Sequence, residues 1–408
     1  MFSERTNWRL TQNRFTQEVE EARARGARLL DLTASNPTRV GLTYNSTAIL
    51  DALHSEKAMD YDPQAKGLLV AREAVARYYE EEKSTIDPER IVLTASTSEG
   101  YSYVFRLLCN VGDELLVPKP SYPLFEFLAD LQDVKLVPYP LIYDHGWQMD
   151  FHSMEKAVTR RTRGVVIVHP NNPTGSYVKE PEVELLNEFC RRHRLALIVD
   201  EVFLDYELGL VQGNAVELRS TGRPGAAVPT SVLKSFSFVN NKNVLTFTLS
   251  GLSKISALPQ MKVAWVVTSG PEEQVEAAMG RLEVIADTYL SMNAPIQWAV
   301  PALFRQRDSI QKQIMERVKA NLVELDRQLA RQTSCQRLQV EGGWYAVLRV
   351  PVTRSDEELA IELVREQSVL VHPGHFYDFE SDGYLVLSLI GNREEFAEGM
   401  GRVLQHIA

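Results

Sequence analysis

The sequence predicts an α/β protein with a large domain, built around a mostly parallel sheet between helices, and a smaller α+β domain. Short apolar, β-branched runs alternate with longer segments in which apolar residues recur every three or four positions. This alternation is typical of parallel strands joined by crossover helices. The chain has 408 residues, of which 44% are hydrophobic and 24% charged, so it can bury the cores of two domains.

Six apolar runs are expected to form strands of the large sheet. They are residues 91–95, 114–118, 164–169, 195–199, 244–250 and 263–268. Helical periodicity lies between them at 69–82 and 182–192, and Pro181 suits the start of the second helix because a first-turn amide needs no partner. Residues 221–230, with the segment 231–243 after them, look like an insertion with some hairpin character.

The last third of the chain has the alternation of a smaller domain. A proline-containing break at 287–297 leads into a long helical stretch at about 301–332. Strand, helix, two short strands and a final helix are then expected, the first four at 343–350, 356–367, 369–371 and 384–389. We therefore expect residues 44–290 to form the large domain, and residues 1–43 with 291–408 the small one.

Charge and cysteine content exclude several classes of function. The net charge of −10 argues against nucleic acid or an anionic membrane as the main partner. Cys109, Cys190 and Cys335 are few and widely spaced, so neither a disulfide framework nor a metal site is expected. The N-terminus lacks the apolar run of a signal peptide, and no span of eighteen apolar residues occurs, which favours a cytoplasmic protein without a membrane segment.

Ligands of open parallel sheets bind beyond the carboxyl ends of the strands, so the residues that follow each strand are candidates for function. Ser96, Thr97 and Ser98 follow the first strand and open a helical segment. Hydroxyls and unpaired backbone N–H groups at a helix start can bind an anion. Taken alone, the same pattern is also an ordinary N-cap.

Three further strands end in polar residues. Asn172 stands in a Pro-rich turn after residues 164–169, Asp200 ends a buried strand, and Lys254 follows residues 244–250. A buried carboxylate needs a cation or a donor. Burial also lowers the pKa of a lysine, and the neutral amine can form a Schiff base with an aldehyde. Each residue alone also fits a turn, cap or solvated loop, but their joint order favours an active site.

The joint order of motifs resembles the fold-type I pyridoxal-phosphate aminotransferases, the class I/II family that includes aspartate, aromatic and alanine aminotransferases. The similarity extends nearly end to end. It rests on ASNPT, YDPQAKGLLVAREAVARYY, LTASTSEGY, GDELLVPKPSYPLF, HPNNPTG, IVDEVF, SGLSK and GGWYAVL. The resemblance implies pyridoxal 5'-phosphate as cofactor, and transfer of an amino group from an amino acid or amine to a 2-oxo acid.

The resemblance also implies roles for single residues. Lys254 would carry the cofactor as a Schiff base and shuttle the proton, and Asp200 would pair with the pyridine nitrogen. Asn172 would donate to the phenolic oxygen, and Tyr122 would stack on the ring. The phosphate would lie among five hydroxyl side chains and one lysine: Ser96, Thr97, Ser98, Ser250, Ser253 and Lys262.

Other implied residues concern the partner subunit and the substrate. Tyr61 matches a tyrosine that reaches the phosphate of the neighbouring subunit, which implies a homodimer with shared active sites. Asn36 lies in a loop that would close over the substrate. Asn172, His375 and Arg393 are the further candidates for substrate binding.

Three positions depart from the family pattern. Val386 stands where most members have an arginine that clamps the substrate carboxylate, and valine cannot bind an anion. Arg393, or His372 with His375, could replace that arginine. Phe203 lacks the hydroxyl of a tyrosine that donates to the phenolic oxygen, which predicts a raised pKa of the Schiff base.

The third departure is Lys262, which replaces a phosphate-binding arginine and loses its two-pronged geometry. The leading hypothesis remains amino transfer. A pyridoxal-phosphate lyase, decarboxylase or cyclase on the same fold is the alternative, and the missing arginine clamp at Val386 makes it relevant. A regulatory cofactor-binding protein is disfavoured because the sequence has neither a DNA-binding module nor a basic face.

Overall fold

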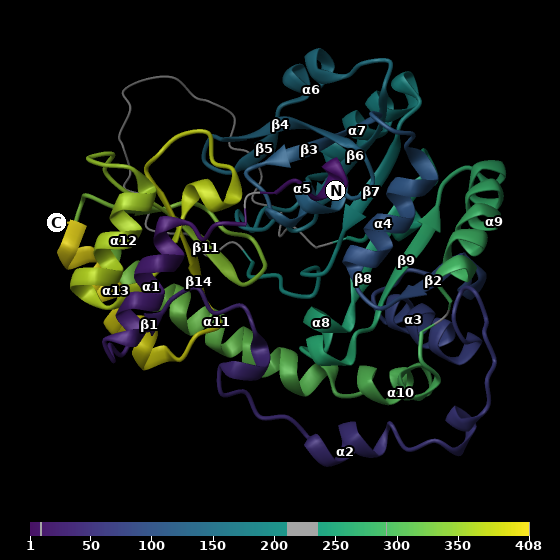
Figure 1. The fold of residues 1–408 in the computed structure, drawn as a ribbon, viewed down its shortest axis with the longest axis horizontal. Coiled ribbons are helices and arrows are strands. Elements are labelled where there is room, and N and C mark those ends of the chain that lie inside the picture. Colours follow the sequence, from purple (N-terminus) through teal and green to yellow (C-terminus); the bar gives the residue numbers. More distant parts are fainter. Residues whose placement is uncertain (9, 210–235, 291, 408) are drawn as a thin grey trace, which may run out of the picture.

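The structure is a computed structural model that describes residues 1–8, 10–209, 236–290 and 292–407. Its centre is an eight-stranded sheet in the order β2-β9-β8-β7-β6-β3-β4-β5 (Figure 1). The strands are β2 (Ile91–Thr94), β3 (Glu114–Lys119), β4 (Lys135–Tyr143), β5 (Trp147–Met149), β6 (Thr162–Val168), β7 (Ala196–Asp200), β8 (Thr246–Gly251) and β9 (Ala264–Ser269).

The sheet is mostly parallel, as predicted. The run from β8 through β7, β6 and β3 to β4 pairs in parallel. Only β9 and β5 pair antiparallel with the strands beside them. Every residue of β7 is buried, because a sheet covered on both faces needs continuous apolar strands rather than alternating ones.

Helices cover both faces of this sheet, and together they form the large unit. The helices are α3 (Leu69–Glu81), α4 (Thr97–Leu108), α5 (Leu124–Asp130), α6 (Phe151–Ala157), α7 (Glu180–His193), α9 (Glu272–Tyr289) and α10 (Ala294–Phe304). Val92 of β2 packs with α4 and α9 on one face, and Leu93 packs with α3 and α10 on the other. Successive residues of one strand thus serve two cores.

The small unit holds a second, antiparallel sheet in the order β10-β11-β14-β13. Its strands are β10 (Gln336–Arg337), β11 (Tyr345–Arg349), β13 (His372–Pro373) and β14 (Tyr384–Ser388). Its helices are α1 (Arg14–Ala24), α11 (Arg307–Leu329), α12 (Asp356–Gln367) and α13 (Arg393–Ile407). The N-terminal strand β1 (Leu30–Asp31) pairs in parallel with β12 (Val369–Leu370), so both ends of the chain belong to one core.

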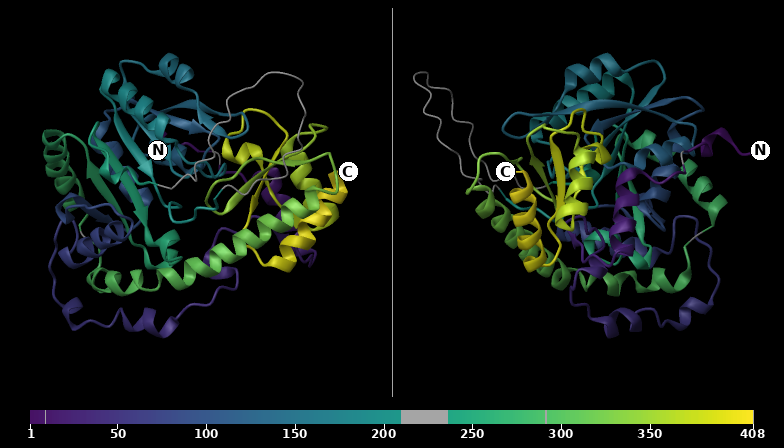
Figure 2. Two further views of the ribbon diagram at one scale, coloured as in Figure 1. Left: turned by 180° about the vertical axis from the view of Figure 1, so that it is seen from behind. Right: turned by 60° about the vertical axis from the view of Figure 1, so that its left-hand side comes forward.

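Most predicted elements are found, one is wrong, and several elements were not predicted. The six predicted strands and the helix at 356–367 are confirmed. The single long helix at 301–332 is wrong: α10 ends at Phe304, and α11 begins at Arg307 and extends from the large unit to the small one (Figure 2). The antiparallel pair β4–β5 at the sheet edge was not predicted.

The predicted domain border at 290/291 stays a prediction, but packing shows where α10 lies. Its residues Ile296, Val300 and Leu303 join the core formed by α3 and the sheet rather than that of the small unit. The proposed insertion at 221–230 lies outside the described residues. Of the segment after it, residues 236–243 contain the short 3-10 helix η5 (Phe238–Asn240).

Candidate functional site

A cavity of about 730 Å³ lies between the carboxyl ends of the central strands and the small unit. It is where an open α/β sheet is expected to bind its ligand. Most of the sequence-predicted site residues line it. Those on its wall are Ser96, Thr97, Ser98, Tyr122, Asn172, Asp200, Ser253, Lys254 and His375.

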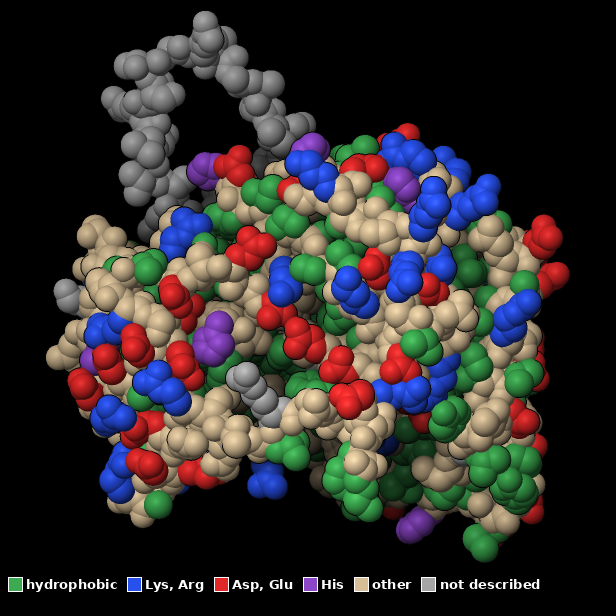
Figure 3. Space-filling model, turned by 45° about the horizontal axis from the view of Figure 1, so that its top comes forward, with side chains coloured by type: hydrophobic (Ala, Val, Ile, Leu, Met, Phe, Trp, Pro, Cys, Tyr) green, Lys and Arg blue, Asp and Glu red, His purple; other side chains and the backbone are tan. Residues whose placement is uncertain are grey.

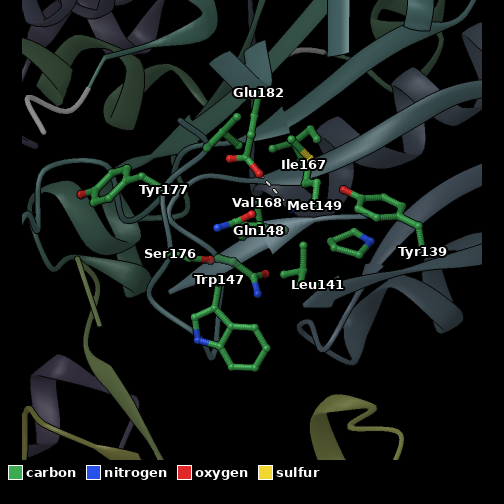
Figure 4. A pocket seen from close by; sticks show the side chains of 13 residues that line it. Tyr139, Leu141, Trp147, Gln148, Met149, Ile167, Val168, Ser176, Tyr177 and Glu182 are labelled. Carbon is green, nitrogen blue, oxygen red and sulfur yellow. Dashed lines mark hydrogen bonds between the residues drawn. The ribbon is translucent and has the colours of Figure 1, made fainter. Parts of the chain in front are cut away.

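A second cavity is far smaller. It measures about 20 Å³ and lies against β4, β5 and the start of α7, where the Glu182 carboxylate accepts the Met149 N–H at 2.8 Å (Figure 4). Such a volume holds about one water molecule. The large cavity is therefore the candidate active site.

Lys254 lies on the single-turn helix α8 (Leu252–Ile255), directly after β8. Its backbone is held by Tyr206, whose hydroxyl donates to the Lys254 carbonyl at 2.6 Å. Its Nζ stands 4.8 Å from the ring centroid of Trp344 and 5.4 Å from that of Phe203. Burial among these groups lowers the pKa of Lys254 to about 8, although the charge of Asp200 opposes the shift. The amine therefore loses its proton more easily than an exposed lysine does.

Asp200 ends β7 and faces the same cavity. Its Oδ2 accepts the Tyr101 hydroxyl at 3.0 Å, and its Oδ1 accepts the Val202 N–H at 3.1 Å. Burial raises the pKa of Asp200 to about 6, and these two donors limit the shift. Asp200 is 9% exposed, and its carboxylate stays charged at neutral pH. It can therefore pair with a protonated ring nitrogen of a ligand.

The start of α4 supplies an anion-binding corner of the cavity. Ser96 is the N-cap, and its hydroxyl accepts the Glu99 N–H at 3.2 Å. Thr97 and Ser98 follow in the first turn and line the cavity. Their hydroxyls and the positive end of a twelve-residue helix favour a phosphate.

Asn172 offers a polar atom that needs a ligand. The residue is 7% exposed, and its Oδ1 has no hydrogen-bond partner among the described residues. A buried amide oxygen without a partner is costly unless a bound group satisfies the amide. Tyr122, in contrast, presents its ring to the cavity and is 45% exposed, so one face is free to stack on a planar ligand.

Five sequence-predicted residues do not lie on the cavity wall. Ser250 is buried, and its hydroxyl donates to the Glu201 carbonyl at 3.4 Å. Lys262 caps the 3-10 helix η6 (Pro259–Met261) and is exposed. Asn36 caps η2 (Pro37–Arg39), with its Oδ1 accepting the Thr38 N–H at 3.0 Å.

The other two residues off the wall are on the outside of the chain. Arg393 begins α13, is exposed, and donates to the Glu316 carbonyl at 3.3 Å, so its position does not support a substrate clamp. Tyr61 is 80% exposed. Its predicted role concerns a neighbouring subunit and stays a prediction.

Sequence reasoning missed several wall residues: Asn13, Ser35, Glu126, Tyr377 and Asp378. For Trp344 and Tyr345, which follow a double glycine, the sequence leaves core packing and pocket lining equally open. Both occur, because Trp344 is fully buried beneath Lys254 whereas Tyr345 lines the cavity. Asn13 and Ser35 come from the N-terminal segment; no motif marked Asn13, whereas Ser35 stands in the ASNPT motif next to the predicted Asn36.

Two of the departures are visible in the structure. Phe203 lines the cavity and brings no hydroxyl to it. Val386 lies in the middle of β14, is 1% exposed, and pairs with Val347 on one side and His372 on the other. No arginine lines the cavity within the part of the chain that the structure describes.

Comparison with known proteins gives one consistent family. The family model described as aminotransferase class I and II matches residues 28–402. The glutamate-pyruvate aminotransferase AlaA of Haemophilus influenzae is 26% identical over 396 residues, covering 93% of this chain and 91% of that protein. The alanine aminotransferase of Mycobacterium tuberculosis is 24% identical over 402 residues, covering 95% and 87%. The solved structure of an alanine aminotransferase from Pyrococcus furiosus superposes with a TM-score of 0.83 at 21% identity, over 100% of this chain and 99% of that one.

Proposed function

The chain belongs to the class I and II aminotransferases, and on that premise we propose that Lys254 is its catalytic lysine, in the cavity between the two units. It is a pyridoxal-phosphate-dependent aminotransferase of fold type I. The residue assignment rests on one observation: the Lys254 amine, whose pKa is lowered, and the buried Asp200 carboxylate both face one cavity.

The residues on the wall fit the cofactor. The Lys254 amine would bind its aldehyde, Asp200 its ring nitrogen, and the start of α4 its phosphate. Tyr122 would stack on the ring, and the side-chain NH2 of Asn172 would donate to the phenolic oxygen. When bound, the cofactor supplies an electron sink that stabilises the carbanion formed at the substrate carbon.

The chain itself supplies acid–base chemistry and orientation. Asp200 stays anionic at neutral pH and would keep a proton on the ring nitrogen, with the Tyr101 hydroxyl fixing one of its oxygens. Lys254 Nζ would take up the proton of the substrate carbon and return it, since its pKa of about 8 lies close to the working pH. The rings of Trp344 and Phe203 exclude water around that nitrogen.

We infer that the substrates are an amino acid and a 2-oxo acid. The names of the relatives, glutamate-pyruvate and alanine aminotransferase, support alanine and glutamate as the first donors to test. Phosphate binding would involve Ser253 from α8 as well as α4. Ser250 is buried behind the wall, and Lys262 is exposed away from it.

We further propose a homodimer with shared active sites in the cytoplasm. The dimer is supported by Tyr61, which is 80% exposed and belongs to the segment between α2 (Ser46–Asp51) and α3. Figure 1 shows this segment along the outer edge of the large unit. The compartment is supported by three free thiols, Cys109, Cys190 and Cys335. No described helix is long and apolar enough to cross a membrane. Acidic and basic side chains both occur across the face shown in Figure 3.

Borohydride trapping tests the catalytic lysine. The protein loaded with pyridoxal phosphate is reduced and digested, and mass spectrometry locates the adduct, which is expected on Lys254. Lys254→Ala should abolish the adduct, whereas Lys262→Ala, a matched lysine loss off the wall, should keep it. An adduct that survives in Lys254→Ala contradicts the proposal.

Amino donors then separate transfer from elimination. Transfer converts the loaded protein to its pyridoxamine form and releases one 2-oxo acid. Elimination releases ammonia together with the oxo acid and leaves no stable pyridoxamine form. Ammonia release from every active donor would replace the proposed reaction by the lyase alternative.

A further inference from the structure

An amino-acid substrate brings a carboxylate into the cavity, and that anion needs donors. The acidic residues Glu126 and Asp378 also line the wall, but a carboxylate cannot bind another carboxylate. Asp378 Oδ2 lies 3.7 Å from Lys119 Nζ. Since no described arginine lines the cavity, the remaining basic side chains on the wall, apart from Lys254, are His372 and His375.

His372 occupies a distinctive place in the small sheet. It lies on β13 directly opposite Val386 of β14, and opposite residues of an antiparallel pair project to the same face. Val386 is sealed in the core at 1% exposure, whereas His372 is partly buried and lines the cavity. The imidazole of His372 thus reaches the cavity from the same face of the sheet as the apolar valine, as does the cavity residue Tyr345 of β11.

Tyr377 sets which ring nitrogen of His372 carries the proton. The Tyr377 hydroxyl lies 3.0 Å from His372 Nδ1 and has no other acceptor among the described residues. Burial raises the pKa of Tyr377 and lowers that of His372 to about 4, so a hydroxyl meets a neutral ring. With the hydroxyl donating to Nδ1, the ring proton sits on Nε2. Nε2 has no hydrogen-bond partner in the described part of the chain.

His375 is placed less favourably. It is exposed, whereas His372 is partly buried; each ring has one acid near it, Asp356 for His375 and Asp31 for His372, so exposure is what separates them. Tyr377, in contrast, lies beside the cavity residues Tyr122 and Tyr345, so the His372–Tyr377 pair is close to the face on which the cofactor ring would stack.

We propose that His372, oriented by Tyr377, binds the substrate carboxylate through its Nε2–H. This proposal rests on the proposed function, since it names the residue that recognises the amino-acid substrate in the same site. A neutral N–H donating to a carboxylate is a charge-assisted hydrogen bond. His372 then determines specificity for substrates that carry a carboxylate beside the reacting carbon.

The test measures binding rather than turnover. 2-Methylalanine and 2-amino-2-methylpropan-1-ol differ only in a carboxylate against a hydroxymethyl group, and neither has a proton to lose from the reacting carbon. Each is titrated into the pyridoxal-phosphate-loaded protein, and the absorbance change of the cofactor gives Kd. The parent protein should bind the acid at least tenfold more tightly than the alcohol.

Variants assign that preference to His372. His372→Phe should weaken binding of the acid about tenfold to hundredfold and leave the alcohol unchanged, because only the acid loses a charge-assisted hydrogen bond. Tyr377→Phe should weaken binding of the acid severalfold, because the proton of the His372 ring is then free to move from Nε2 to Nδ1. His375→Phe is the matched histidine control and should keep the preference.

Several outcomes would overturn the proposal. The first is a parent protein that binds the acid no more tightly than the alcohol. The second is an equal rise in Kd for both ligands in His372→Phe. The third is a rise in Kd for the acid alone in His375→Phe. A double variant, His372→Ser with Val386→Arg, places a guanidinium on the same face and should restore preference for the acid. If no amino compound, alanine and glutamate included, perturbs the cofactor absorbance, the proposed function itself fails.

Discussion

Two neighbouring acids at the end of β7 serve different purposes. Asp200 faces the cavity, whereas Glu201 points into the large unit, where it accepts the Ser237 hydroxyl at 2.6 Å and the Phe238 N–H at 2.7 Å. Burial raises the pKa of both, to about 6 for Asp200 and about 8 for Glu201. The acid that would pair with the cofactor therefore stays charged at neutral pH, and the structural acid binds a proton there.

The raised pKa of Glu201 predicts how stability depends on pH. Between about pH 4.5 and 8 the folded carboxyl holds a proton that the unfolded one releases, so this group's contribution to stability falls as pH rises. Glu201→Gln should remove that decline, which is worth on the order of 1–3 kcal/mol in the free energy of unfolding. Urea denaturation of the cofactor-free protein at pH 5, 6.5 and 8 measures it.

An exposed acid serves as control for this prediction. Glu188→Gln on α7 should leave the pH slope of stability unchanged, because Glu188 is solvated. If Glu201→Gln keeps the full decline of the parent protein, the buried carboxyl is not its source.

At the scale of elements, the turn after β6 ties the two units together. Gly175 has φ +68° and donates its N–H to the Asn171 carbonyl at 2.7 Å. Its carbonyl accepts the N–H groups of Glu341 and Gly342, at 3.1 and 2.9 Å. A Cβ at this position would lie 2.6 Å from the Gly342 oxygen and would also meet Val340. The turn that carries Asn172 therefore needs glycine for space as well as for conformation.

Gly175→Ala should destabilise the protein by about 3 kcal/mol or more, because backbone strain and a steric clash combine. Gly41→Ala is the matched control: Gly41 has φ +70°, but a Cβ there meets nothing within 4 Å. It should cost only about 1 kcal/mol of strain. Equal losses in the two variants, measured by thermal or urea unfolding, would show that the contact with residues 340–342 has no role.

At the scale of the whole molecule, a cluster of polar side chains joins α11 to the large unit. Asp205 accepts the Tyr78 hydroxyl of α3 at 2.6 Å and the Gln311 amide of α11 at 2.5 Å. Arg307, at the start of α11, pairs with Glu81 of α3 at 2.6 Å. The cavity thus has walls from both units, and its shape depends on how they are held together.

The proposed homodimer with shared active sites predicts the activity of dimers that combine two different variants. Lys254→Ala and Tyr61→Ala homodimers should each be nearly inactive, since every site lacks one required residue. When equal amounts of the two variants are unfolded together and refolded, about half of the dimers contain one chain of each. Each of these hybrids has one intact site of its two, so about one quarter of the parent activity should return. Sites built from one chain alone would regain none, and sedimentation measures the oligomeric state in parallel.

The sequence predicted six strands of the large sheet, the family, and the position of Lys254, Asp200 and Asn172 at the ends of strands. These follow from local patterns, because apolar periodicity encodes the elements and the residues after parallel strands gather at one edge of a sheet. The break between α10 and α11 was not predicted, since both helices read as one periodic run. Pro301 sits inside α10 and did not mark the border.

Only the tertiary structure decided which polar residues share the cavity. Arg393, His375 and His372 were all candidates in the sequence. Strand register places His372 beside Val386, whereas His375 lines the cavity but is exposed, and Arg393 is exposed away from its wall. Asn13, Ser35 and Tyr345 reach the wall from three distant segments. These residues meet only because the small unit packs on the large one. Local sequence patterns do not encode such long-range packing.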